Sequence, residues 1–127
     1  MTVTQYLDGI KERLLSDVLI RTFRITRERV TLVDGYLRAR LTLRDGSLLE
    51  FSEYVQHFPA DEIRVVTYSY HWGDARGDLI RRWDNTPHFP GLPGFPHHIH
   101  EGDTNEVLPG HPVNVFVVLD EIAQYLA

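Results

Sequence analysis

The sequence predicts an α+β fold: an N-terminal helix, a curved antiparallel β-meander of about five strands, a loop rich in histidine and proline, and a C-terminal helix. Apolar residues recur at helical spacing at both ends of the chain and alternate with polar residues in between. Short turns join the alternating segments, which favours a meander because parallel strands need long crossovers. The 127 residues fit one domain, 1–127.

The two helices are predicted from apolar stripes. The segment from Thr4 to Asp17 starts with a residue type that can cap a helix and has apolar residues three and four positions apart, at Leu7, Ile10 and Leu14. Near the other end, Asn114 is a suitable N-cap. The stripe that follows it consists of Val115, Val118, Leu119, Ile122 and Leu126. We expect each helix to bury this stripe against the sheet.

Between the helices, apolar residues alternate with polar ones. In the stretch 37–43, Leu or Ala alternates with Arg or Thr, which is typical of a strand with one buried face. Asp34-Gly35 precedes this stretch and Asp45-Gly46 follows it, and Asp-Gly between such runs predicts a hairpin turn. The five strands predicted in this way are 18–25, 37–43, 48–55, 63–72 and 79–83.

The segment from Asn85 to Pro112 has a different composition. It contains six of the seven prolines and four glycines, a density that excludes helix and inner strand. The apolar residues Phe89, Leu92 and Phe95 predict a loop that is fixed to the body of the domain. We expect this loop to cross the sheet after its last strand.

Composition excludes several classes of protein. The content of 43 % hydrophobic and 24 % charged residues is typical of a globular domain. The absence of cysteine excludes disulfides and thiolate metal sites. No stretch approaches the ~20 apolar residues that span a bilayer, and Met1 to Ile10 lacks the pattern of a secretory signal. We therefore expect a cytoplasmic protein with no membrane partner. The net charge of −5 argues against a general nucleic-acid coat protein.

The order of residues after Tyr68 is distinctive. Tyr68-Ser-Tyr-His-Trp72 is followed by Leu79-Ile-Arg-Arg-Trp-Asp-Asn85, by Pro87-His88 and by Phe95-Pro-His-His-Ile-His100. This pattern resembles the TumE family of small bacterial toxins, and similar residues extend it over most of the chain, from about Ile25 to Gly102. The resemblance implies a single TumE-like domain that acts inside the cell as a toxin. It also implies a cognate antitoxin, commonly a helix-turn-helix protein.

Two positions depart from the family pattern. Phe89 stands where members often carry a second histidine, and Ile99 stands where they often carry a lysine. These changes remove a proton carrier and a phosphate contact. The remaining histidines of the pattern are all present: His88, His97, His98 and His100.

These four histidines are the catalytic candidates, because histidine gains and loses a proton near neutral pH. Cleavage of RNA needs one group that takes the proton of the 2′-hydroxyl and another that supplies a proton to the leaving oxygen, so paired histidines suit an endoribonuclease. Histidines can also hold a loop in place through stacking and hydrogen bonds, and we assign this structural role to His57 and His111. His71, between Tyr70 and Trp72 on a predicted strand, fits either role.

A divalent metal at this cluster is an alternative. Its ligands would be His97 or His98 with His100, together with Asp84 or Asp103. The chain has no HExxH helix, and a loop constrains ligand spacing poorly. We place proton transfer by histidine ahead of metal chemistry and assign no metal ligand and no cofactor.

Arginines are the candidates for phosphate binding, because a guanidinium group can form two parallel hydrogen bonds with phosphate. Arg81 and Arg82 are successive residues of a predicted strand and should face opposite sides of the sheet. One of them could bind phosphate, or pair with Asp84 to fasten the loop. Arg38 and Arg40 share the exposed face of their strand, where they could bind RNA, dock an acidic antitoxin segment or remain solvated.

The leading functional hypothesis is the toxin of a type II toxin–antitoxin module that acts on RNA as an endoribonuclease. A second hypothesis is a non-catalytic binding module that blocks a cellular target or only pairs with a helix-turn-helix partner. A third is a metal-dependent nuclease or hydrolase. The strand 48–55 leaves room for an edge-to-edge homodimer.

Overall fold

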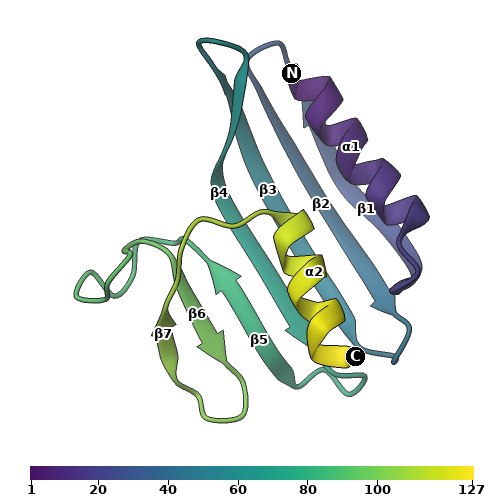
Figure 1. The fold of residues 1–127 in the computed structure, drawn as a ribbon, viewed down its shortest axis with the longest axis vertical. Helices are drawn as coiled ribbons and strands as arrows, with labels where there is room; N and C mark the ends of the chain where they lie inside the picture. Colours follow the sequence, from purple (N-terminus) through teal and green to yellow (C-terminus); the bar gives the residue numbers. More distant parts are fainter.

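Two helices pack on one face of a seven-stranded antiparallel sheet (Figure 1). The computed structural model describes residues 1–127. The strands lie in the sheet in the order of the chain, so every pairing joins neighbours in sequence. The elements are α1 (Val3–Ser16), β1 (Ile20–Val30), β2 (Asp34–Leu43), β3 (Leu48–Phe58), β4 (Glu62–Gly73), β5 (Leu79–Asp84), β6 (His98–Glu101), β7 (Val107–Pro109) and α2 (Val115–Leu126). The predicted α+β meander is confirmed.

The sheet has seven strands rather than about five, because β6 and β7 lie inside the segment that was predicted to be only a loop. β6 can form because His98–Glu101 is a stretch without proline. Pro109 ends β7. This strand lies at the edge of the sheet, where a proline, which has no N–H, does not remove a hydrogen bond between strands. The loop that remains, 85–97, does not cross the sheet but projects beyond it (Figure 1).

Both helices begin with a side-chain cap. The cap of α1 is Thr2 rather than Thr4: its hydroxyl accepts a hydrogen bond from the Gln5 N–H, and the Gln5 side chain accepts one from the Thr2 N–H. Asn114 caps α2 as predicted, since its side chain accepts from the N–H of Val117. Neither helix is both long and apolar enough to cross a membrane.

Gly35 has a different role from the one predicted. Asp34-Gly35 is not a turn, because both residues lie in β2 and the turn occupies 31–33. A Cβ atom on Gly35 would lie 2.6 Å from Cγ1 of Val3, so the glycine allows α1 to approach the sheet closely. Asp45-Gly46 is a turn as predicted, with a φ of +87° at Gly46.

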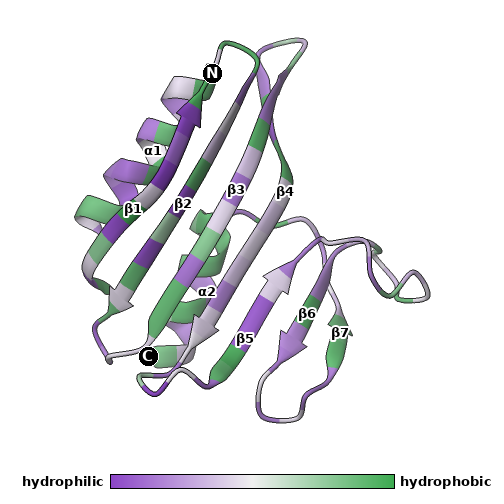
Figure 2. Ribbon diagram, turned by 180° about the vertical axis from the view of Figure 1, so that it is seen from behind, coloured by the Kyte–Doolittle hydropathy of each residue, from purple (hydrophilic) through white to green (hydrophobic).

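Hydrophobic and hydrophilic residues alternate along β2 and β3 (Figure 2), so the two faces of the sheet differ in polarity. The face toward the helices carries the apolar core, which includes Leu37, Leu41, Phe51, Tyr70 and Trp72. The other face bears no helix (Figures 1 and 2), and its side chains are largely polar because successive strand residues point to opposite sides. We call this second face the open face.

The two edges of the sheet are β1 and β7. β3 lies between β2 and β4 and pairs with both. The strand 48–55 is therefore an interior strand with no free edge. The predicted possibility that two copies of the chain pair through the edge of this strand was wrong.

Candidate functional site

A row of charged and histidine side chains crosses the open face. Its members are direct cross-strand partners on β1 to β6, in the order Arg24, Arg40, Glu50, His71, Arg82 and His100. Side chains directly opposite each other in antiparallel strands have Cβ atoms roughly 4.5–5.5 Å apart. We call this set the open-face row. Strand pairing thus brings together residues that are far apart in the chain.

A depression of about 440 Å³ lies over the middle of the open-face row. Its lining offers two guanidinium groups, one imidazole, one carboxylate and two hydroxyls, with a single apolar residue. The residues are Arg38, Glu50, Phe51, Ser52, Ser69, His71 and Arg82. A volume of this size is in the range of small-molecule sites, and the polar lining suits a phosphate ester better than an apolar ligand.

Arg82 links His100 to Asp84. Its Nη2 atom lies 3.2 Å from Nδ1 of His100. Its Nε atom lies 3.1 Å from Oδ2 of Asp84, an ion pair without the direction of a hydrogen bond. Because a guanidinium only donates, Nδ1 of His100 accepts, and neutral His100 carries its proton on Nε2. This Nε2 atom is buried and has no hydrogen-bond partner within the protein.

The surroundings of His100 favour its neutral form. Burial lowers its pKa from the usual 6.5, and the positive charges of Arg82 and His98 lower it further, while Asp84 has the opposite effect. His100 is therefore uncharged at neutral pH, which is the state that a general base requires.

Replacing Arg82 by glutamine is expected to raise the pKa of His100, because glutamine keeps an N–H donor but removes a positive charge that lowers this pKa. The pKa should stay below 6.5, since burial is the largest cause of the shift. The measurement is an NMR titration of the His100 ring in both proteins. Arg81→Gln, on the other face of β5, is the control and should leave the titration unchanged. Equal pKa values in the wild type and Arg82→Gln would contradict the contact.

His98 is held inside the structure, with 2 % of its surface exposed. Its Nε2 atom lies 2.9 Å from Oδ1 of Asp84, and its Nδ1 atom lies 3.0 Å from the carbonyl oxygen of Pro96. Both partners are acceptors, so both contacts are hydrogen bonds only when both ring nitrogens carry a proton. The ring of Phe89 packs against His98 and His100, with centroid distances of 5.2 and 5.8 Å. This placement lets His98 position Asp84 and fasten the loop to β6.

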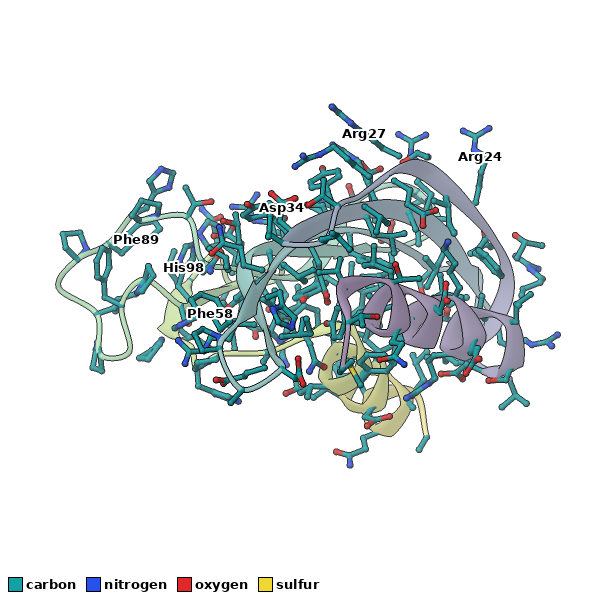
Figure 3. The ribbon with its side chains drawn as sticks, turned by 90° about the horizontal axis from the view of Figure 1, so that it is seen from above. Arg24, Arg27, Asp34, Phe58, Phe89 and His98 are labelled. Carbon is teal, nitrogen blue, oxygen red and sulfur yellow. The ribbon has the colours of Figure 1, made fainter.

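Of the other two candidate histidines, His97 lies on the opposite side of the sheet from the open-face row, whereas His88 is close enough to His100 to contribute to the lowering of its pKa. The His97 ring stacks on Tyr68 of the helix-covered face at 5.7 Å between centroids, and its Nδ1 atom lies 2.8 Å from the Tyr68 hydroxyl. Burial lowers the pKa of His97. His88 lies in the projecting loop, with its ring 6.1 Å from that of Phe89; Figure 3 shows Phe89 and His98 at the same end of the molecule. The structure therefore brings His98 and His100 together but places His97 on the opposite side of the sheet.

The four candidate arginines divide between the two faces. Arg82, Arg38 and Arg40 lie on the open face, where the last two share the carboxylate of Glu50. Arg81 lies on the helix side, with Nε 2.7 Å from Oε1 of Glu101, again without the direction of a hydrogen bond. The opposite orientation predicted for Arg81 and Arg82 is confirmed by the register of β5.

The sequence left the role of His71 undecided and did not indicate the two serines of the depression, Ser52 and Ser69. The register of β3, β4 and β5 places His71 between Glu50 and Arg82. The signal that could have revealed this position is the pair of tight turns at 59–61 and 74–78, because short hairpin turns fix the register of the strands they join.

The metal site considered from the sequence lacks a set of ligands in the structure. No group of three or more histidine, aspartate or glutamate side chains is arranged to hold a metal ion. His98 and Asp84, two of the ligands considered, instead bind each other.

One family of known proteins matches this chain. The model of the family described as "Toxin TumE" matches residues 10–126, a range that includes all seven strands and α2. Neither a curated protein nor a solved structure matches the chain. The family match confirms the resemblance seen in the residues from Tyr68 to His100. The chain therefore belongs to the TumE family of toxins.

Proposed function

We propose that this protein is the toxin of a type II toxin–antitoxin module and that it cleaves RNA inside the cell at the open-face row. Membership of a toxin family supports the first part, together with a cognate antitoxin as partner. The observation that carries the second part is the succession of His71, Arg82 and His100 on neighbouring strands β4, β5 and β6. Two imidazoles on either side of a guanidinium can supply the general base, the general acid and the charge stabilisation for cleavage of a phosphodiester.

The reaction proceeds between the two histidines. Their backbones are two strand spacings apart, roughly 10 Å, so a phosphodiester bound to Arg82 lies between the rings. The phosphate takes over the Arg82 N–H, which frees Nδ1 of His100 to accept the proton of the 2′-hydroxyl. The 2′-oxygen then forms a bond to phosphorus, and the bond from phosphorus to the 5′-oxygen breaks as protonated His71 donates a proton to that oxygen. The products are a 2′,3′-cyclic phosphate and a 5′-hydroxyl end.

The depression supplies further contacts for the substrate. Arg38 lines it together with Arg82 and offers a second guanidinium. In the free protein, Glu50 binds both Arg38 and Arg40, so a phosphate competes with this carboxylate. The hydroxyls of Ser52 and Ser69 lie on the same face and can donate to phosphate or ribose oxygens.

The test is RNA cleavage by the purified protein, with and without EDTA. We expect cleavage to survive the chelator and to leave cyclic phosphate ends. His71→Ala and His100→Ala should each slow it by roughly 10²–10⁴-fold. His57→Ala is the control, since His57 pairs only with the exposed Asp61. His97→Ala, on the helix side, separates the two groups of histidines and should leave the rate unchanged.

Other outcomes would select the alternative functions. Cleavage that EDTA abolishes would replace this proposal with a metal-dependent nuclease. The absence of any cleavage by a folded protein that is still toxic would replace it with a non-catalytic binding module. Retained cleavage in both His71→Ala and His100→Ala would remove the reaction from the open-face row.

A further inference from the structure

The outer edge of β1 is a long row of unpaired backbone groups. β1 has 11 residues and pairs only with β2. The opposite edge of the sheet, β7, has three residues. An exposed edge strand offers free N–H and C=O groups to any further strand, so β1 is the place where another chain can extend this sheet.

The side chains of β1 give this edge a strong positive charge. Arg24, Arg27 and Arg29 lie on the open face, opposite Arg40, Arg38 and Tyr36 of β2. Figure 3 shows Arg24 and Arg27 pointing away from the helices. Neither of these two arginines forms an ion pair within the chain. The chain as a whole has a net charge of −5. The positive charge of the arginines on β1 is therefore opposite in sign to the net charge of the protein.

A second copy of this chain does not fit the edge of β1. Antiparallel pairing of β1 with itself would bring the arginines of the two strands next to one another, and like charges that face each other across strands are destabilising. Nucleic acid has no backbone amide groups with which to continue a β-ladder. The edge therefore calls for a polypeptide of opposite charge.

We propose that β1 binds an extended acidic segment of another protein, which adds to the sheet as an eighth strand. Every second residue of that segment is acidic and faces Arg24, Arg27 and Arg29. The residues in between are apolar and lie beside Phe23 and Ile25, which are only half-buried on the helix side. Arg27 and Arg29 are alternate residues, and a β-bulge between Ile25 and Arg27 puts Arg24 on the same face, opposite Arg40. Alternate residues of the added strand are roughly 7 Å apart, so its acidic side chains can face this row of arginines. The antitoxin that the toxin family implies is the natural carrier of such a segment.

Binding of a synthetic peptide tests the charge pattern. The probe is a labelled ten-residue peptide in which glutamate alternates with valine, and its affinity is measured by fluorescence anisotropy. Arg24→Glu/Arg27→Glu should weaken binding by roughly tenfold or more. Arg76→Glu is the matched control, because Arg76 has an 86 % exposed side chain outside the sheet edge. Equal binding to the double variant and the wild type would overturn the proposal.

Backbone methylation tests strand addition itself. Two versions of the peptide carry N-methyl groups on alternate residues, in one case on the odd positions and in the other on the even positions. Only one set of amides faces β1 in an added strand, so one version should bind as before and the other should not. Equal affinities of the two versions would show adsorption by charge alone and overturn the proposal. A double variant that loses affinity for single-stranded RNA, but not for the peptide, would assign these arginines to nucleic acid instead.

Discussion

Replacing Arg82 by alanine is expected to lower the rate of RNA cleavage by roughly 10²–10³-fold, the effect of removing one donor that stabilises developing charge. Arg82 stands between His71 and His100 in the open-face row and lines the depression. Its loss removes the positive charge at the position of the phosphate and leaves Nδ1 of His100 without its donor. The measurement is single-turnover cleavage of a short RNA at saturating protein.

The neighbouring residue supplies the control for this prediction. Arg81→Ala changes the same residue type on the same strand, but on the face toward the helices, and should leave the cleavage rate unchanged. Arg82→Lys should recover part of the rate, because lysine keeps the charge but not the planar fork of donors. Equal losses in Arg81→Ala and Arg82→Ala would show that the arginines stabilise β5 and not the transition state.

Replacing Glu53 by alanine is expected to lower the free energy of unfolding by roughly 3 kcal/mol or more, because three buried donors lose their acceptor. The carboxylate of Glu53 is fully buried. It accepts hydrogen bonds from the hydroxyls of Tyr6 and Tyr70 and from the N–H of Val115, at 2.6, 2.7 and 2.7 Å. These donors belong to α1, β4 and the first residue of α2, so one side chain joins three elements. Urea unfolding followed by circular dichroism measures the loss.

Glu50→Ala is the matched control for this stability prediction. Glu50 lies three residues earlier on β3, on the open face, with a side chain that is 32 % exposed. Its ion pairs with arginine should contribute at most about 1 kcal/mol. A loss as large as that of Glu53→Ala would contradict the role given to the buried carboxylate.

The ionisation of Glu53 should make stability depend on pH. Burial raises its pKa above the usual 4.5, although the three donors act in the opposite direction. The folded state therefore favours the protonated carboxyl group. Its contribution is fully present below pH 4.5 and is lost as the pH rises through the raised pKa. The stability of the wild type relative to Glu53→Gln should fall over this range, and a constant difference in urea unfolding would contradict the shift.

The sequence predicted the strands in which apolar and polar residues alternate, and it missed the two strands in which no such alternation can be recognised. Leu37 to Leu43 alternates strictly and forms β2 as predicted. β6 and β7 have four and three residues, too short for a period to be recognised, and the surrounding prolines pointed to a loop. Their pairing depends on β5, which already stands beside them, so it is a consequence of tertiary structure that no local pattern contains.

The sequence indicated some residues of the candidate site, among them Arg82 and His100, but not their arrangement. Alternation alone separated Arg81 from Arg82, and proximity in sequence grouped His97 with His98. The structure places His97 and His98 on opposite sides because they, too, are successive residues at the start of a strand. His71 belongs to the open-face row through the register of three strands, which depends on turns and a bulge between Trp72 and Gly73.

The strands lie in the sheet in the same order in which the ribosome synthesises them. Since each strand pairs with the one made just before it, the sheet can grow as the chain leaves the ribosome, with its N-terminal part first. β1 and its basic edge are then available early, whereas His100 arrives with β6 and the donor from Val115 to Glu53 arrives later still. A partner that binds β1 can therefore engage the nascent chain before the open-face row is complete.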